Sequence, residues 1–323
     1  MAQEIELKLS LPQAYQCRFA ALDLLQKYAS AAVQIKALHN SYFDTPGQQL
    51  NQHAAALRVR RQGEQYIQTL KTRGSSQGGL HQRPEWEWTV PSAALDLALL
   101  PPQALPDGVR LDALAIAFAT DFERSCWMLS YPFAGKLAQI ELVLDVGAAS
   151  SGDQRDSISE IELELKSGPT EALFALALEL ATQVPLRVSR ISKAQRGYRL
   201  LRPEQARRIP AAPPLLPAVG EQFALNTAQQ WLERLQGVLE AYAFSADRQL
   251  LAEAPGSFAG LRQQLELAPQ VPAELRQRLT AQQQVLSELL SAPDNQAQIQ
   301  AWLDDLELGL CLLTLSRWLY QQR

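Results

Sequence analysis

Carboxylate and basic side chains recur at alternate positions in several short segments of the chain. EIELK contains Glu4, Glu6 and Lys8, and LRVRR contains Arg58 and Arg60. Side chains two residues apart in an extended strand share one face, so each set would lie together, opposite apolar neighbours. Like charges placed side by side repel one another unless a counter-charge lies between them. Paired carboxylates therefore indicate a divalent cation, and paired arginines indicate an anion that carries several charges.

Three further segments repeat this arrangement. PEWEWTV brings together Glu85 and Glu87, and IELVLDVG brings together Glu141 and Asp145. In SEIELELK the residues of one face are Glu160, Glu162, Glu164 and Lys166. Carboxylate oxygens suit magnesium or manganese, which bind one or two carboxylates and complete their coordination with water and substrate phosphates. The same alternation also occurs in ordinary antiparallel sheets with one face in water, so the pattern alone leaves both interpretations open.

The first part of the chain would position these residues on strands. Apolar and polar residues alternate there with period two, which predicts about eight strands. The predicted strands span residues 3–9, 41–44, 56–61, 65–71, 84–90, 118–130, 137–146 and 159–166. Helices are predicted after Pro12 and Pro169, because proline is tolerated in the first turn of a helix. GSSQGG (residues 74–79) and SSGDQRDS (residues 150–157) are typical of hairpin connections.

The last hundred residues have a different periodicity. Apolar residues such as Trp231, Leu235 and Leu239 are spaced three or four apart, which predicts a bundle of roughly four amphipathic helices. Just before them, RIPAAPPLLPAVG contains clustered prolines, which favour an extended backbone. The sequence therefore predicts a first domain at residues 1–202, a linker at 203–220 and a helical domain at 221–323.

Composition and motifs exclude several classes of protein. The 323 residues are 47% hydrophobic and 20% charged, which is typical of a globular protein. No apolar run approaches the ~20 residues of a membrane-spanning helix, and the N-terminus lacks a signal-peptide core, so we expect a cytoplasmic protein without a membrane partner. The cysteines and histidines form no CxxC or HExxH motif, and glycine-rich phosphate loops are absent. A net charge of -4 disfavours nucleic acid as a partner.

Nine motifs, in order along residues 1–200, resemble the CYTH family of triphosphate tunnel metalloenzymes. They are EIELK (4–8), YFDTP (42–46), LRVRR (57–61), TLK (69–71), RPEWEW (83–88), DFERSCW (121–127), LVLDVG (142–147), EIELELKSG (160–168) and SKAQRGYRL (192–200). The resemblance implies an α+β chain in which an eight-stranded antiparallel β-barrel forms a tunnel, followed by an all-α helical bundle. Charged faces would then point inward, and a barrel of this size can hold a small ligand.

The resemblance also implies roles for the charged residues. The implied triphosphate ligands are Lys8, Arg58, Arg60, Lys71, Arg124, Arg187 and Lys193, with Arg190 as an alternative to Arg187. The implied metal ligands are Glu4, Glu6, Asp145, Glu162 and Glu164, supported by Glu85 and Glu87. The residues expected to act in catalysis are Glu4, Glu6, Lys8, Arg58, Arg60 and Lys193. Glu160 and Lys166 share the same face and are further candidates.

The activity that the resemblance implies is metal-dependent hydrolysis of inorganic triphosphate to pyrophosphate and phosphate. Two Mg²⁺ or Mn²⁺ ions would take part, one bridging phosphoryl oxygens and one orienting water, and no covalent nucleophile is needed. The same tunnel is compatible with a class IV adenylate cyclase-like activity or with thiamine triphosphatase activity. From another class, a non-catalytic polyphosphate- or nucleotide-binding module would keep the basic residues without activating water.

The helical region resembles a shortened CHAD domain, a helical module associated with polyphosphate. Residues 221–323 contain seven arginines and twelve acidic residues, which gives a charge of 7 - 12 = -5, and they contain neither histidine nor lysine. An anion-binding groove needs cations, so we expect polyphosphate binding to have been lost here. We expect these helices to bury apolar surface against the barrel or to form a homodimer.

Overall fold

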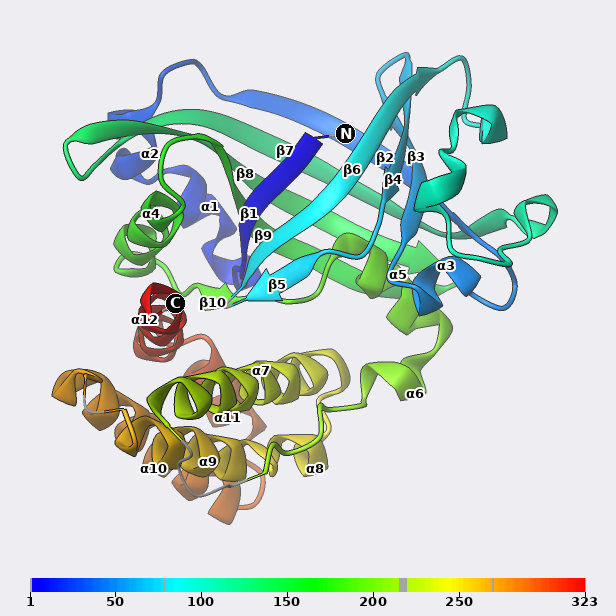
Figure 1. The fold of residues 1–323 in the computed structure, drawn as a ribbon. Coiled ribbons are helices and arrows are strands. Elements are labelled where there is room, and N and C mark those ends of the chain that lie inside the picture. The colour runs from blue at the N-terminus through cyan, green and yellow to red at the C-terminus, as the bar shows by residue number, and fades with distance from the viewer. Residues whose placement is uncertain (1, 78, 215–219, 269, 323) are drawn as a thin grey trace.

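The computed structural model describes residues 2–77, 79–214, 220–268 and 270–322, and it shows a β-barrel above a layer of helices (Figure 1). The strands of the described residues are β1 (Ala2–Ser10), β2 (Gln34–Asp44), β3 (Ala56–Gln62), β4 (Gln65–Lys71), β5 (Ser75–Gln77), β6 (Leu80–Val90), β7 (Ala115–Phe133), β8 (Lys136–Ser151), β9 (Gln154–Ser167) and β10 (Arg187–Val188). They form one antiparallel sheet in the order β10-β1-β9-β8-β7-β2-β3-β4-β6-β5. Pairing of β1 with β6 closes the eight central strands into a barrel, so the predicted fold is confirmed.

The predicted strands are present, and several are longer than the alternation suggested. β2 begins at Gln34 instead of residue 41, because it pairs along its whole length with β7. The hairpin predicted at 150–157 is confirmed, since Ser151 pairs with Gln154 across a turn at Gly152. The connection predicted at 74–79 contains β5, which pairs with β6, and its residue 78 lies outside the described residues.

The barrel is followed and covered by helices. Those of the first part are α1 (Gln16–Ala20), α2 (Asp23–Tyr28), α3 (Gln49–Gln52), α4 (Glu171–Ala181), α5 (Lys193–Leu201) and α6 (Pro203–Ala206), with short 3-10 turns at Gln13–Tyr15, Leu97–Leu99, Pro102–Ala104 and Leu111–Ala113. The single helix expected after Pro12 is wrong. Leu22 adopts an extended backbone between α1 and α2, which places its side chain in the same buried cluster as Phe19 and Leu25. Tertiary burial therefore outweighs the local helical pattern.

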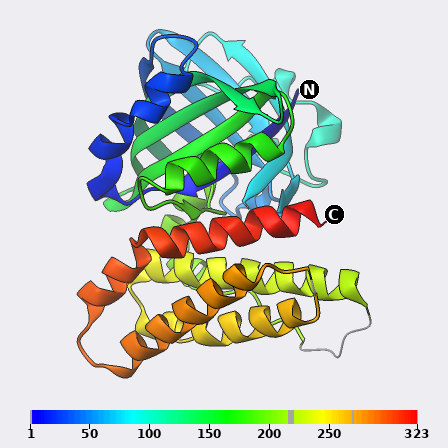
Figure 2. The same ribbon diagram turned by 90° about the vertical axis from the view of Figure 1, so that its left-hand side faces the viewer.

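The outer face of the barrel is apolar and packs against α4 (Figure 2). Leu7 and Leu163 of neighbouring strands are fully buried together with Phe174 of α4. Because side chains alternate along a strand, Glu6 and Lys8 beside Leu7 must point into the barrel. Burial of the apolar face thus fixes the direction of the charged face.

The C-terminal helices are α7 (Glu221–Ser245), α8 (Arg248–Leu251), α9 (Ala254–Glu266), α10 (Ala273–Ser291), α11 (Gln296–Leu303) and α12 (Leu306–Gln321). α12 runs between the barrel and the other helices (Figure 2). Its Leu313 joins the buried cluster of the barrel, whereas Leu312 and Leu315 join the cluster of the helices. The helical region therefore buries apolar surface against the barrel. No helix in the described ranges combines the length and hydropathy needed to cross a bilayer.

α5 fits tightly against the barrel and carries Lys193 as its first residue. Its start is fixed by a capping box, in which Ser192 Oγ accepts from the Gln195 amide and Gln195 Oε1 accepts from the Ser192 amide. Its middle packs on Phe118, and the Tyr198 hydroxyl donates to Asp44 Oδ2 at 2.7 Å. The position of Lys193 therefore depends on this packing.

We expect Gly197→Ala to destabilise the protein by about 1–3 kcal/mol, the usual cost of overpacking a core. A Cβ atom at Gly197 would lie 1.9 Å from Phe118 Cδ2, so α5 or the ring must move. The matched control is Gly256→Ala in α9, where no atom lies within 4 Å of the added Cβ. Because alanine is the better helix former, this control should gain about 0.5–1 kcal/mol. Thermal denaturation of both variants measures the difference, and equal melting temperatures would contradict the packing described.

Candidate functional site

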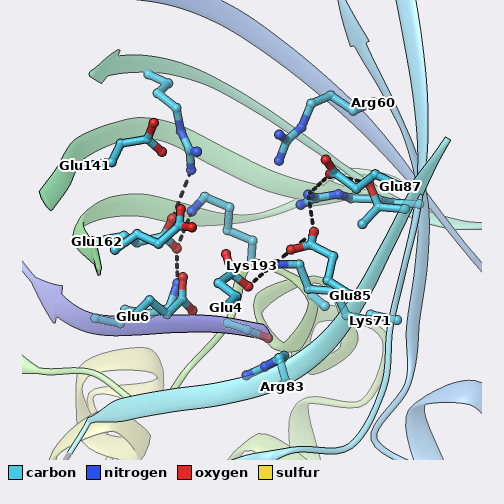
Figure 3. A pocket seen from close by; sticks show the side chains of 18 of the residues that line it. Glu4, Glu6, Arg60, Lys71, Arg83, Glu85, Glu87, Glu141, Glu162 and Lys193 are labelled. Atoms are coloured by element: carbon cyan, nitrogen blue, oxygen red, sulfur yellow. Dashed lines mark hydrogen bonds and ion pairs between the residues drawn. The ribbon is translucent and has the colours of Figure 1, made fainter. Parts of the chain in front are cut away.

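The inward faces of the eight barrel strands and the start of α5 enclose a cavity of 380 Å³ (Figure 3). The cationic residues that line it are Lys8, Arg58, Arg60, Lys71, Arg83, Arg124, Lys166 and Lys193. The carboxylates that line it are Glu4, Glu6, Glu85, Glu87, Glu141, Glu162 and Glu164. The cavity therefore combines positive and negative side chains at a nearly even ratio, as the sorted strand faces predicted.

Two predicted site residues do not line this cavity. Asp145 is fully buried behind its wall, where it contacts Arg124 and Lys193. Arg187 lies on β10, which pairs with the end of β1 opposite Ser10, outside the barrel. Its side chain lines a small pocket next to α7, away from the charged cavity. The structure therefore brings together the other predicted ligands and leaves Arg187 apart.

Arg190, the alternative to Arg187, also lies outside the charged cavity. Its guanidinium pairs with Glu233 of α7 at 3.4 Å, and its backbone amide donates to Glu240 Oε1 at 2.6 Å. The adjacent Ser189 amide donates to the carbonyl of Lys8 at 2.9 Å. The segment before α5 is thus fixed between the helical region and β1, which helps to position Lys193.

Three lining residues were not among the implied ligands. Arg83 and Glu141 had no assigned role, and Lys166 was only a further candidate. Arg83 lies two and four residues before Glu85 and Glu87, so period-two alternation could have placed it on the same face. Glu141 and Lys166 form an ion pair of 3.6 Å across β8 and β9. These residues enlarge the site without changing its chemical character.

At one end of the cavity two lysines bind a group of three carboxylates. Lys193 Nζ lies 2.6 Å from both Asp145 Oδ2 and Glu160 Oε1, and 3.0 Å from Glu162 Oε1. Lys8 pairs with Glu160 and Glu162. Burial opposes the charged form of both lysines, but the carboxylates outweigh it and raise the pKa of each. These three acids lie close enough together to hold a metal ion, yet ammonium groups already lie among them.

Arginines complete this buried ion network. Arg124 donates to both oxygens of Asp145, at 2.8 and 2.7 Å, and to Glu162 at 2.9 Å. Arg196 Nε lies 3.4 Å from Glu160 Oε2. Burial disfavours the charged carboxylate of Glu160, but its cationic neighbours hold its pKa at about 2. The three carboxylates are thus neutralised by four cations of the same network, which positions Lys8, Lys193 and Arg124.

We expect Glu160→Gln to destabilise the protein by about 3–5 kcal/mol, because it removes one of three carboxylates from a buried network that keeps all of its cations. Since the folded pKa is lowered, the stabilisation by Glu160 is present above its unfolded pKa of about 4.3 and is lost as the pH falls toward 2. Urea denaturation should therefore show a large difference from wild type at neutral pH and a smaller one in acid. If instead the variant is stable and only its metal requirement changes, the network is a metal site.

A second group of carboxylates has fewer cationic partners. Glu6 is only 8% exposed, lies across from Glu164, and forms no ion pair with any residue that the structure describes. Burial raises the pKa of Glu164, as do the nearby Glu4 and Glu141, although Lys166 at 2.7 Å lowers it. Buried charge is costly unless it is paired. Glu4 lies nearby but pairs with Lys71 at 2.7 Å. Glu6 and Glu164 are therefore the carboxylates that a divalent cation would stabilise most.

The opposite wall has the complementary property. Arg60 Nε donates to Asn40 Oδ1 at 2.9 Å, and its guanidinium has no carboxylate partner within the described ranges. Burial lowers the pKa of Arg60 to about 9, and the neighbouring Arg58 and Arg124 lower it as well. Arg58 lies 4.0 Å from both Glu85 and Glu87. An anion with several charges would relieve the repulsion among these arginines.

The chain is similar to several known proteins. The CYTH domain model matches residues 2–198. An inorganic triphosphatase of Haemophilus influenzae is 35% identical over 205 residues, which cover 62% of this chain and 55% of that protein. The chain thus spans about half the length of this curated relative. Among solved structures, a putative adenylyl cyclase from Hippeastrum is 20% identical with a TM-score of 0.44, covering 59% of this chain and 93% of its own. A putative adenylate cyclase from Bacillus halodurans is 23% identical with a TM-score of 0.36, covering 61% and 98%.

Proposed function

Since the chain belongs to the CYTH domain family, we propose that it hydrolyses inorganic triphosphate to pyrophosphate and phosphate inside the barrel, with Mg²⁺ or Mn²⁺. One observation carries this proposal: the buried carboxylate of Glu6 faces a cavity whose opposite wall holds Arg60, and neither forms an ion pair with any described residue. A cation is needed on one side and an anion on the other. A metal complex of a small polyanion supplies both. The inorganic triphosphatase from Haemophilus influenzae supports the same substrate.

The charge of the cavity fits a triphosphate with bound cations. Eight cationic and seven acidic side chains line it, so the wall alone is close to neutral. A triphosphate together with two divalent ions adds little net charge. The acids thus prevent strong repulsion among the cations when no ligand is bound, while the arginines remain available for phosphate oxygens.

The chain's own residues would bind and orient the substrate. Glu4, Glu6 and Glu164 would hold the metal, with Glu162 and Asp145 fixing the adjacent basic residues. When bound, a divalent ion polarises phosphoryl oxygens and lowers the pKa of a bound water. Arg58, Arg60 and Lys71 would donate to phosphate oxygens on one side. Lys8, Arg124 and Lys193, held by the buried network, would donate on the other. Phosphoryl transfer requires mainly such positioning and charge stabilisation.

The test is to incubate the purified protein with tripolyphosphate in Mg²⁺, in Mn²⁺ or in a chelator, and to separate the products. We expect equal amounts of phosphate and pyrophosphate, formed only with metal. ATP and thiamine triphosphate are assayed in parallel. Preferential formation of cyclic AMP from ATP would favour the adenylate cyclase-like alternative, and faster cleavage of thiamine triphosphate would favour that activity. Binding of tripolyphosphate without turnover in either metal would favour the non-catalytic alternative.

We also propose that residues 1–202 and 221–323 are separate domains joined by residues 203–220, and that the helical domain is a shortened CHAD-like module. Its position against the barrel supports a structural role, since Leu313 of α12 is buried in the barrel's apolar cluster. A homodimer through these helices remains a prediction, which light scattering on the purified protein tests. A cytoplasmic location and the absence of a nucleic-acid partner also remain predictions.

A further inference from the structure

A second and larger cavity, of 540 Å³, lies between the barrel and the helical region. The chain from α5 through α6 to α7 follows this side of the barrel (Figure 1). The two cavities share lining residues, namely Ala56 of β3, Arg83 of β6, and Ser192 and Ala194 around the start of α5. The two cavities therefore adjoin at these residues, and we call the second one the rear chamber.

The rear chamber is strongly basic. Its charged arginines are Arg73, Arg83, Arg190, Arg199 and Arg208, whereas Glu240 is the one carboxylate among its described lining residues. Arg190 and Arg199 already have partners, Glu233 at 3.4 Å and Asp156 at 2.7 Å. Arg73, Arg83 and Arg208 form no ion pair with any described residue. Three guanidinium groups thus face this space without a counter-charge.

Arg83 connects the two cavities. It lies on β6 beside the charged cavity, below Glu85 and Lys71 in Figure 3, which pair with each other at 3.3 Å. A phosphate chain that extends past Arg83 would leave the tripolyphosphate site and meet Arg73 and Arg208. Arginine guanidinium groups bind phosphate oxygens with two parallel hydrogen bonds, so these residues suit further phosphates of the same chain.

We propose that the rear chamber binds the additional phosphates of linear inorganic polyphosphates longer than triphosphate, so that the site accepts substrates of greater chain length. This inference rests on the proposed function and names its substrate class. The chamber does not suit a nucleoside. Tyr198 and His81 carry its aromatic rings among the described residues, and they are only 6% and 4% exposed. No free aromatic face is offered to a base.

Binding without turnover tests the proposal. Titration calorimetry in a chelator compares tripolyphosphate with a longer linear polyphosphate, using the full chain and the double variant Arg73→Gln/Arg208→Gln. We expect the double variant to bind the longer chain about 5- to 10-fold more weakly, the loss of two partly exposed ion pairs. Its affinity for tripolyphosphate should be unchanged. Because each phosphate contact adds to salt dependence, wild-type affinity for the longer chain should also fall more steeply with salt than that of the variant.

The matched control is Arg61→Gln/Arg155→Gln, which removes two exposed arginines that line neither cavity. It should bind both ligands as wild type does. The proposal is overturned if Arg73→Gln/Arg208→Gln binds the longer chain as tightly as wild type, or if its affinity for tripolyphosphate falls equally. An assay of tripolyphosphate cleavage with added metal then separates the rear-chamber proposal from the proposed hydrolysis. A protein that binds the longer chain through the rear chamber but cleaves no tripolyphosphate would contradict only the proposed hydrolysis.

Discussion

Glu6→Gln should reduce metal-dependent hydrolysis of tripolyphosphate by about 10²- to 10⁴-fold, the range for loss of a positioned catalytic carboxylate. Glu6 is buried, faces the cavity, and has no cationic partner in the described part of the chain. A neutral amide cannot balance a divalent cation, and it orients an attacking water less well. Initial rates measured over a range of metal concentrations should show both a lower maximum and a higher metal requirement.

The stability of the same variant distinguishes this role from a structural one. Glu6 is buried and forms no ion pair with the residues that the structure describes, so its replacement by glutamine should leave the metal-free protein as stable as wild type, or more stable. Glu123→Gln is a matched control, because Glu123 lies exposed on β7 and does not line the cavity. It should retain wild-type activity. Metal-dependent turnover near the wild-type rate in Glu6→Gln would refute the assignment.

The difference between Glu6 and Glu160 could not be seen in the sequence. Both occur in alternating acidic segments, and both were possible metal ligands. The register of the barrel separates them, because Lys8 is paired with Glu162 and Glu6 with Glu164. One set of carboxylates is thereby neutralised by lysines, and the other is left for a cation. Alternation predicts which side chains share a face, whereas strand pairing decides which charges meet.

The position of Arg187 could not be predicted from the sequence either, for a different reason. The family resemblance implied that Arg187 is a phosphate ligand, but β10 contains only two residues and gives no alternation to interpret. Pairing with the end of β1 places Arg187 beyond the barrel wall, next to the helical region. Arg58 and Arg60, by contrast, lie on a seven-residue strand whose apolar residues Leu57 and Val59 are buried. Alternation along a long strand therefore predicted which side chains face the cavity, whereas a two-residue strand offered no such pattern.

Arg60→Gln should reduce kcat/KM for tripolyphosphate by about 10²- to 10³-fold, the usual effect of removing one group that stabilises developing charge. Arg60 is held by Asn40 and lies beside Arg58 and Arg124, with no carboxylate partner among the described residues. Its free guanidinium can therefore bind an oxygen of the transferred phosphate. Arg60→Lys should recover only part of the rate, because an ammonium group lacks the planar pair of donors. Steady-state kinetics with tripolyphosphate measure both variants.

The stability of Arg60→Gln gives an independent readout. The lowered pKa of Arg60 means that its charge disfavours the folded state, so the variant should melt at a higher temperature than wild type when no ligand is present. Tripolyphosphate should then stabilise the variant less than it stabilises wild type, since a weaker ligand shifts the folding equilibrium less. Arg61→Gln, the exposed neighbour on the outer face, should change neither quantity. An equal stabilisation of wild type and Arg60→Gln by tripolyphosphate would show that the anion binds elsewhere.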